Sequence, residues 1–316
     1  MSDDKIQIGI SSCLLGEEVR FDGGHKRDGY VMQTLGRYFE YVPVCPEVGI
    51  GMGIPRPPIR LEGDPDRPRA VGVRDKSMDV TKALEDYARG RVPELPAISG
   101  YILKSRSPSC GMARVKVYGE KGMPAGNGSG IYARVLMEEL PLLPVEDEGR
   151  LHDPVLRENF VNRVYVYHRW QKLVAGGLTP GRLIAFHSDH KYMVMAHSQA
   201  AYERMGRLLS NLKGRDLQAL GDAYVAELMT ALKRRVSRKR HVNVLQHIMG
   251  YLRRTLTADE KAEMSEAIEA YRREEVPLVV PVTLIRHHFR RVPDPYIGRQ
   301  LYLNPYPEPL GLRNQI

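Results

Sequence analysis

The sequence holds three cysteines, Cys13, Cys45 and Cys110, each in a loop-like setting rich in Ser, Pro, Gly or Glu. Core cysteines usually behave as small buried apolar residues, so these polar surroundings favour metal binding or catalysis. Three thiols are compatible with three kinds of site. They could bind a zinc ion that keeps an open position, or a 4Fe-4S cluster with one unligated iron, or one of them could be a catalytic nucleophile beside a base. The cysteines are 32 and 65 residues apart without a CxxC motif, so their spacing leaves these alternatives open.

Each cysteine follows a segment typical of a β-strand: residues 5–11, 40–44 and 98–104. Helix-like segments at 26–39 and 79–91 separate the strands, and Asp79 is the expected N-cap of the second helix. Strands that alternate with helices predict an α/β N-terminal domain with a parallel, Rossmann-like sheet. Ligands of such sheets gather beyond the carboxyl ends of the strands, where we expect the three cysteines to converge.

The remaining sequence has a different character. The Gly-rich stretch 119–130 lacks the spacing of a dinucleotide or P-loop fingerprint, so we predict a mobile loop without a phosphate-binding role. From about residue 155 the apolar residues recur with helical period, as in 217–232, which predicts a mainly α-helical C-terminal domain. The Pro-rich tail 292–311 is expected to pack as an extended segment. We therefore predict two domains, 1–150 and 151–316.

Excess positive charge is confined to the second domain. Residues 1–150 carry 21 Lys and Arg against 22 Asp and Glu, whereas residues 151–316 carry 26 against 16. The strongest basic run contains Lys233, Arg234, Arg235, Arg238, Lys239 and Arg240. Such a stripe favours contacts with RNA phosphates over a merely solvated helix face.

Three histidines, His187, His190 and His197, fall on one face if residues 182–200 form a continuous helix. A metal site is one interpretation, but only Asp189 is at hand to join them. Packed or hydrogen-bonded histidines are the favoured interpretation, and RNA contact comes second.

Five motifs in order resemble the thiouracil desulfidase domain: S-x-C-L-L-G at 11–16, V-R-F-D-G at 19–23, C-P-E at 45–47, P-R-P-P at 55–58 and S-P-S-C-G at 107–111. The remainder, including AFHSDHKYMVMAHS at 185–198 and YLNPYPEPL at 302–310, resembles the helical domain often fused to it. This two-domain arrangement is similar to that of bacterial tRNA 4-thiouridine desulfidases. Phe21 stands where the family often has Tyr, which puts no catalytic role in doubt.

The resemblance implies a 4Fe-4S cluster bound by Cys13, Cys45 and Cys110, with Glu47 and Ser107 as catalytic residues. Sulfur on C4 of a pyrimidine would bind the open iron, which makes that carbon a better target for water. Glu47 would accept the proton of the water, Ser107 would relay it or hold the base, and the net reaction would be hydrolysis. The candidate substrate-binding residues are Asp22, Lys26, Arg56 and Ser109.

Other functions share these features. A desulfidase of free 2-thiouracil or thiouridine would use the second domain for packing or assembly, and a non-catalytic iron-sulfur or zinc RNA-binding protein or redox sensor would release no sulfide. A protein that inserts sulfur is compatible with the same cluster.

No stretch approaches the roughly 20 apolar residues of a membrane span, and the start lacks a targeting core. We therefore expect a cytoplasmic protein that acts on thiolated tRNA or a small thiolated pyrimidine and binds no membrane.

Overall fold

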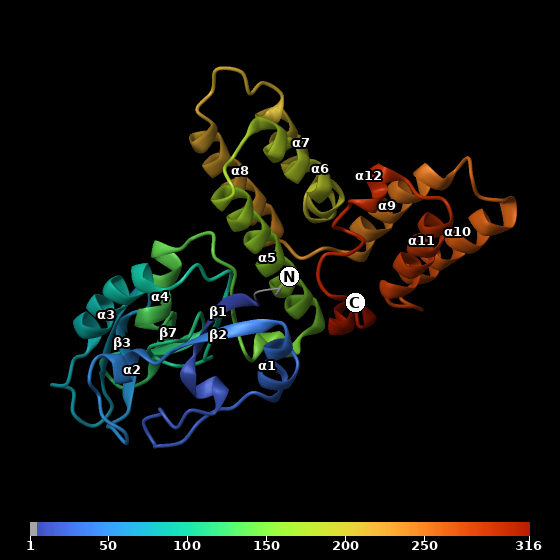
Figure 1. Cartoon of the computed structure of the whole chain (residues 1–316). Helices are drawn as coiled ribbons and strands as arrows, with labels where there is room; N and C mark the ends of the chain where they lie inside the picture. The colour runs from blue at the N-terminus through green and yellow to red at the C-terminus, as the bar shows by residue number, and fades with distance from the viewer. Residues whose placement is uncertain (1–4) are drawn as a thin grey trace. The chain divides into compact units, whose positions relative to one another are not determined.

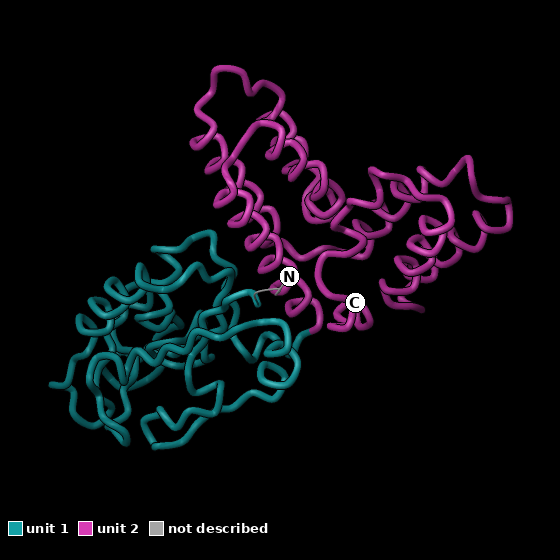
Figure 2. Tube along the Cα trace, in the orientation of Figure 1, with its two compact units in different colours: residues 1–153 teal, residues 154–316 magenta. Residues whose placement is uncertain are grey.

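The structure, a computed structural model, describes residues 5–316 (Figure 1). The chain divides into two compact units, Met1–Asp153 and Pro154–Ile316 (Figure 2). Unit 1 contains both β-sheets, and unit 2 is built from helices.

The first sheet of unit 1 has four strands in the order β2-β1-β5-β8. The strands are β1 (Ile6–Ser11), β2 (Phe39–Val44), β5 (Tyr101–Leu103) and β8 (Val145–Asp147). All neighbouring pairs are parallel, which confirms the predicted sheet type. Ile8 and Ile10 of the central strand are fully buried, as expected for a parallel sheet that is covered on both faces. The carboxyl ends of β2, β1 and β5 therefore lie side by side at one edge.

A second sheet, in the order β4-β3-β6-β7, was not expected from the sequence. Its strands are β3 (Ile59–Asp64), β4 (Arg67–Gly72), β6 (Val115–Tyr118) and β7 (Pro124–Gly128). The predicted mobile loop at 119–130 is wrong, because most of it forms the turn and second strand of the antiparallel β6-β7 hairpin. Gly122, with a φ of 71°, makes the left-handed bend that this turn needs.

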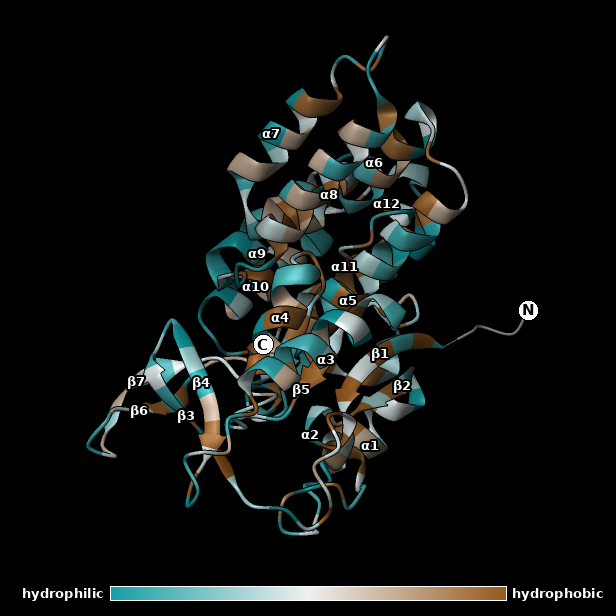
Figure 3. Cartoon of the chain, turned by 90° about the vertical axis from the view of Figure 1, so that its left-hand side faces the viewer, coloured by the Kyte–Doolittle hydropathy of each residue, from teal (hydrophilic) through white to brown (hydrophobic). Residues whose placement is uncertain are grey.

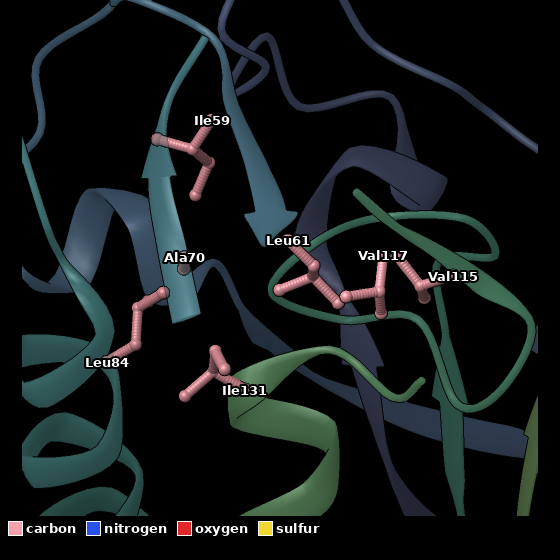
Figure 4. Packing of buried hydrophobic residues seen from close by; sticks show 7 residues of the cluster. All are labelled: Ile59, Leu61, Ala70, Leu84, Val115, Val117 and Ile131. Carbon is pink, nitrogen blue, oxygen red and sulfur yellow. The ribbon is translucent and has the colours of Figure 1, made fainter. Parts of the chain in front are cut away.

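One face of the second sheet is covered by α3 (Thr81–Glu94) and α4 (Ile131–Glu139). The apolar residues that meet there are Ile59, Leu61, Ala70, Leu84, Val115, Val117 and Ile131 (Figure 4). Because side chains alternate along a strand, the residues between them, such as Arg60 and Lys116, lie on the other face. This sheet is therefore apolar on one side and polar on the other.

The short helices of unit 1 differ from their predicted bounds. α1 (Gly29–Gln33), a 3-10 turn and the start of β2 occupy the predicted helix at 26–39, and α2 (Pro46–Gly49) is a single turn. Asp79 is not the N-cap of α3, because the helix is capped at Val80. The Asp79 carboxylate accepts a hydrogen bond of 2.9 Å from the Thr81 backbone N–H and so makes the turn before the helix.

Unit 2 consists of helices, as predicted. They are α5 (Pro154–Ala175), α6 (Pro180–His197), α7 (Gln199–Leu209), α8 (Leu217–Leu232), α9 (Arg238–Met249), α10 (Ala258–Arg272), α11 (Val279–Arg291) and α12 (Pro295–Gly298). α8 coincides with the predicted 217–232, and Leu220, Tyr224 and Leu228 on its apolar face are buried. The tail at 292–311 contains α12 and a 3-10 turn at Glu308–Leu310, so it is less extended than predicted. None of the helices within residues 5–316 combines the length and apolar character that a membrane span requires.

Candidate active site

The carboxyl ends of β1, β2 and β5 open into a cavity of about 1120 Å³ that is lined by Cys13, Cys45 and Cys110, among others. Cys13 lies in a 3-10 turn directly after β1, and Cys45 directly follows β2. Cys110 lies in the loop after β5. Three residues that are remote in the sequence meet at one cavity because their strands are neighbours in the sheet.

The environment of each of the three thiols raises its pKa and so disfavours the thiolate. Burial, followed by the neighbouring Cys45, raises the pKa of Cys13 to about 11, although Lys104 opposes the rise. Burial also raises the pKa of Cys45 and holds that of Cys110 well above its ordinary value. Cys13 and Cys45 add to the effect on Cys110, which indicates that the three sulfur atoms are close enough to influence one another. A bound cationic group would reverse this balance, because metals stabilise thiolates.

The Glu47 carboxylate is held from two sides. Its Oε2 accepts a hydrogen bond of 2.8 Å from Nε of Arg56 and is 2.7 Å from Nη2 of the same ion pair. Its Oε1 accepts a hydrogen bond of 2.8 Å from the Ser109 hydroxyl. Arg56 is anchored in turn by the backbone carbonyls of Gly53 and Val19. The carboxylate is therefore fixed at the cavity wall by Arg56 and Ser109.

Ser107 lines the cavity, and its hydroxyl oxygen is already engaged. It accepts hydrogen bonds from the backbone N–H groups of Ser109 and Cys110, at 3.2 and 3.0 Å. These bonds shape the loop that presents Cys110. The hydroxyl hydrogen is the part of Ser107 that is left to contact a substrate.

The predicted substrate-binding residues separate into two groups. Lys26 and Arg56 line the cavity, but the guanidinium of Arg56 is occupied by Glu47 and the backbone. Asp22 and Ser109 do not line it. Asp22 is half exposed and closes a turn with Arg20 and Gly24, and Ser109 is fully buried behind Glu47. Direct substrate contact by Asp22 or Ser109 therefore stays a prediction, and neither side chain lines the cavity.

Sequence reasoning missed two further polar residues at the strand ends. The Ser11 hydroxyl, at the end of β1, accepts a hydrogen bond of 2.9 Å from the Lys104 backbone N–H and also hydrogen-bonds the Cys110 thiol. Lys104 follows β5, pairs with Glu148 and hydrogen-bonds the Ser105 hydroxyl at 3.0 Å. Ser11 and Lys104 are the last residues of the predicted strands 5–11 and 98–104, so the strand-end rule that selected the cysteines could have found them.

The lining of the cavity is strongly basic. It contains nine Lys and Arg residues and only two acidic residues, Glu47 and Asp147. This excess is not visible in the composition of the unit, because residues 1–150 carry slightly more acidic than basic residues. Folding therefore concentrates positive charge at the cavity.

No group of three or more His, Cys, Asp or Glu side chains within residues 5–316 could hold a single metal ion. The three thiols thus line the cavity without forming a ready-made site for one ion.

The basic run of unit 2 does not lie on one continuous helix. Lys233 caps the end of α8, and α9 starts at Arg238. Arg238 packs over the Tyr271 ring at 4.7 Å and donates to its carbonyl, and Arg240 donates to the His197 carbonyl at 2.7 Å. Arg234, Arg235 and Lys239 are exposed. Part of the predicted RNA-binding run therefore stabilises the fold.

The three histidines of unit 2 lie on α6 and have separate partners. The Nδ1 atoms of His187, His190 and His197 are hydrogen-bonded to the Tyr224 hydroxyl, the Phe186 carbonyl and the Arg234 carbonyl, respectively. Burial lowers the pKa of each of them. Packed and hydrogen-bonded histidines, the favoured interpretation of the sequence, describe them.

Two known protein families match separate parts of the chain. Residues 8–148 match the 2-thiouracil desulfurase family, and residues 191–307 match a protein family of unknown function, DUF1722. The chain is 30% identical over 153 residues to the uncharacterized protein YbgA of Escherichia coli (strain K12), covering 48% of this chain and 90% of YbgA. It is 30% identical over 138 residues to the uncharacterized protein YbbK of Bacillus subtilis (strain 168), covering 41% of this chain and 88% of YbbK.

A solved structure, described as the [4Fe-4S]-dependent thiouracil desulfidase TudS, is similar over 47% of this chain and 95% of its own, at 27% identity and a TM-score of 0.37. The two family matches together span most of the described residues. The chain belongs to the 2-thiouracil desulfurase family, whose domain it joins to a C-terminal DUF1722 domain.

Proposed function

We propose that this protein is a desulfidase that holds a 4Fe-4S cluster through Cys13, Cys45 and Cys110 and removes sulfur from 4-thiouridine in tRNA. The single observation that carries the proposal is that the only three cysteines of the sequence line one cavity, next to the fixed Glu47 carboxylate. Membership of the 2-thiouracil desulfurase family supports an enzyme that removes sulfur from a thiolated pyrimidine.

The donor set fits an iron-sulfur cluster. Thiolates are the ligands that these clusters prefer, and three cysteines leave one iron of a 4Fe-4S cluster without a protein thiolate. The ligands of a single zinc ion would stand within about 4 Å of one another, since Zn–S bonds are about 2.3 Å long. Each thiolate of a cluster binds a different iron, so the sulfurs are further apart.

When bound, the cluster would supply a Lewis-acidic iron that can accept the sulfur of a thiocarbonyl. The balanced reaction is hydrolysis: water adds its oxygen to C4 of the pyrimidine, the carbon–sulfur bond breaks, and sulfur leaves as hydrogen sulfide. No atom of the pyrimidine is oxidised or reduced overall, so the reaction needs no electron donor.

The residues of the chain would orient the reactants and move the proton. Glu47 is the base for the attacking water, because its carboxylate is paired with Arg56 and fixed at the cavity wall. Ser109 and Arg56 act as positioning residues for that carboxylate. Ser107 lines the same cavity and has a hydroxyl hydrogen to donate to the substrate or its leaving sulfur.

Charge supports a nucleic-acid substrate over the free base. Unit 2 carries the basic excess of the sequence, with Arg234, Arg235 and Lys239 exposed. α9 opens with Arg238, Lys239 and Arg240, and no side chain caps its N-terminus. Cations at the positive end of a helix are unfavourable by a few tenths of a kcal/mol each, a cost that an RNA phosphate would offset.

The test is an anaerobic preparation analysed for iron and sulfide, then mixed with tRNA containing 4-thiouridine while the thiouridine absorbance is followed. We expect wild-type protein to convert 4-thiouridine to uridine with release of sulfide. Cys45→Ala should lose both the cluster and the activity. Glu47→Gln should keep the iron and sulfide content and lose at least about 100-fold in rate, as for removal of a general base.

Glu94→Gln is the matched control, because Glu94 is an exposed residue of α3 that does not line the cavity. It should behave as wild type. Full activity of the Glu47→Gln variant would refute the assigned base, and iron-free protein that desulfurates tRNA would refute the cluster. If only free 2-thiouracil or thiouridine is consumed, the tRNA assignment fails and the small-molecule desulfidase remains. Binding of thiolated tRNA without sulfide release would instead identify a non-catalytic protein.

A further inference from the structure

The cavity wall that carries no cysteine is formed in part by the polar face of the second sheet. Arg60 of β3, Lys116 and Tyr118 of β6, and Asn127 of β7 all line the cavity. The sequence pattern did not single out any of them as functional. The four strands of this sheet lie together at one side of unit 1 in Figure 3.

Strand register places these residues on one surface. Lys116 is directly opposite Asn127 in the antiparallel β6-β7 pair, and Tyr118 is beside Glu62 in the parallel β3-β6 pair. Arg60 precedes Leu61, and Lys116 precedes Val117. Leu61 and Val117 are fully buried on the opposite face of the sheet. Because the apolar residues of these strands pack on α3 and α4, the polar ones face away from that core.

Part of this surface is rigid. The guanidinium of Arg60 lies over the Tyr118 ring, 4.8 Å from its centroid. Glu62 fixes Arg60 from the side, with Oε1 at 2.8 Å from Nε. A stacked guanidinium and phenol form the kind of flat cationic and aromatic surface on which nucleic-acid bases stack.

Other cations at the cavity have no acidic partner. Within residues 5–316, the side chains of Arg106, Arg114 and Lys116 make no hydrogen bond or ion pair. Arg106 and Arg114 flank the Cys110 loop with φ angles of 58° and 56°, a left-handed conformation that is uncommon for residues other than Gly, Asn and Asp. Two long cationic side chains thus occupy strained positions beside the candidate cluster ligand.

The cavity is also larger than a pyrimidine needs. Its volume of about 1120 Å³ lies above the range of roughly 300–1,000 Å³ for pockets that enclose drug-sized ligands, so it has room for the proposed cluster and for more than one nucleotide. A base that reacts inside an RNA must leave its stack and enter the pocket, so its neighbours in the strand pass along the rim. Their phosphates require cations there, and four of the nine lining Lys and Arg residues make no ion pair within residues 5–316: Lys26, Arg106, Arg114 and Lys116.

We propose that Arg114, Lys116, Tyr118 and Asn127 form a track for single-stranded RNA that holds the nucleotides next to the thiolated base. Arg114 and Lys116 bind phosphates, the Arg60–Tyr118 stack supports a neighbouring base, and Asn127 hydrogen-bonds its edge. The proposal rests on the proposed function for the identity of the thiolated base. The track itself binds unmodified RNA as well, because none of these contacts involves sulfur.

The first test measures binding of a short, unthiolated single-stranded RNA to the full-length protein by fluorescence anisotropy at several salt concentrations. Lys116→Gln should weaken binding and reduce the salt dependence by about one released counterion. Tyr118→Leu should weaken binding about tenfold, and Tyr118→Phe should restore it, since stacking needs the ring and not the hydroxyl. Lys121→Gln, in the turn of the same hairpin but outside the cavity, is the matched control.

The second test compares substrates. Lys116→Gln and Tyr118→Leu should lower kcat/KM for a short RNA containing 4-thiouridine by a larger factor than for the free nucleoside. Equal RNA binding by all variants, or equal losses on RNA and nucleoside, would overturn the track. If wild-type protein desulfurates no substrate but the variants still weaken RNA binding, the proposed function fails while the track stands. If wild-type protein desulfurates both substrates and the variants match it, the track alone fails.

Discussion

The Ser109 hydroxyl donates a hydrogen bond of 2.8 Å to Oε1 of Glu47, which is 62 residues earlier in the chain. Ser109 is fully buried and does not reach the cavity. The bond joins the loop that carries Cys110 to the turn that carries Cys45 and Glu47. Glu47, which follows Cys45 in the sequence, is therefore oriented by Ser109, which precedes Cys110.

Replacement of Ser109 by Ala should test this bond. The Oε1 atom of Glu47 would lose a buried partner worth about 1.5–3 kcal/mol, so we expect kcat to fall roughly tenfold or more with little change in KM. Iron content should be unchanged because no thiol is removed. Ser129→Ala is the control, since Ser129 makes a bond of the same length to the Met112 carbonyl away from Glu47. Parallel losses in both variants would show that the effect is general destabilisation.

Gly130→Ala should damage the site by steric contact. A Cβ at Gly130 would lie 2.6 Å from the backbone carbonyl of Ser109 and 2.8 Å from the backbone N of Gly111, on either side of Cys110. We expect the loop to shift and iron content after reconstitution to fall by at least about half, as for overpacking that costs about 1–3 kcal/mol. Gly90→Ala is matched to it, because a Cβ there meets nothing within 4 Å and Ala favours the helix. Normal iron loading in Gly130→Ala would contradict the expected clash.

Iron binding should depend on pH through the thiols. Burial raises the pKa of Cys13 to about 11 and keeps that of Cys110 well above its usual value, so both are protonated at neutral pH without iron. Ligation requires the thiolates and releases their protons, so apparent affinity for iron should rise as pH increases from about 7 to 9. Anaerobic reconstitution at several pH values, with iron and sulfide measured after desalting, checks this. Reconstitution that is independent of pH would argue against three buried thiols as ligands.

Unit 2 should lose stability in mild acid. Burial lowers the pKa of His190 to about 3 and that of His197 to about 4, and it holds that of His241 well below its ordinary value. The unfolded chain binds these protons below about pH 6.5 and the folded chain does not, so stability is lost as pH falls from about 6.5 towards 4. The loss at pH 5 is at most on the order of 2 kcal/mol per histidine.

The single tryptophan, Trp170 on α5, reports on unit 2 alone. Denaturant unfolding followed by its fluorescence at pH 7 and pH 5 measures the loss directly. His197→Gln should reduce the pH dependence, and the same change at the exposed His247 should not. A stability that is unchanged down to pH 5 would contradict the prediction.

RNA affinity should depend on the exposed part of the basic run. Arg235→Gln combined with Lys239→Gln should weaken tRNA binding and lower the salt slope by about two, since each lost phosphate contact removes about one released counterion. Arg272→Gln combined with Arg273→Gln is a control of the same charge change, because Arg272 is already paired with Glu269 and Arg273 with Glu266 and Glu275. Filter binding across a salt series distinguishes the two. An equal slope in both variants would remove this run from the RNA interface.

The sequence by itself determined the parts of the molecule that depend on local pattern. Alternating apolar residues predicted β1, β2 and β5, and helical periodicity predicted α8 with its bounds. Parallel strands end at a shared edge, so the predicted strands were enough to predict that Cys13, Cys45 and Cys110 converge. In the structure the three cysteines line one cavity. The Gly-rich hairpin of β6 and β7 was missed, since glycine weakens the strand signal and its pairing partner gives no local cue.

Tertiary structure alone decided which polar residues reach the cavity. Ser107 and Ser109 are two residues apart in one motif, yet only Ser107 lines the cavity, because a turn of the backbone directs Ser109 into the protein towards Glu47. The basic wall depends on strands distant in sequence, as in the approach of Arg60 to Tyr118. Local pattern reports which face of a strand is apolar, whereas the neighbours of the polar face are set by long-range packing.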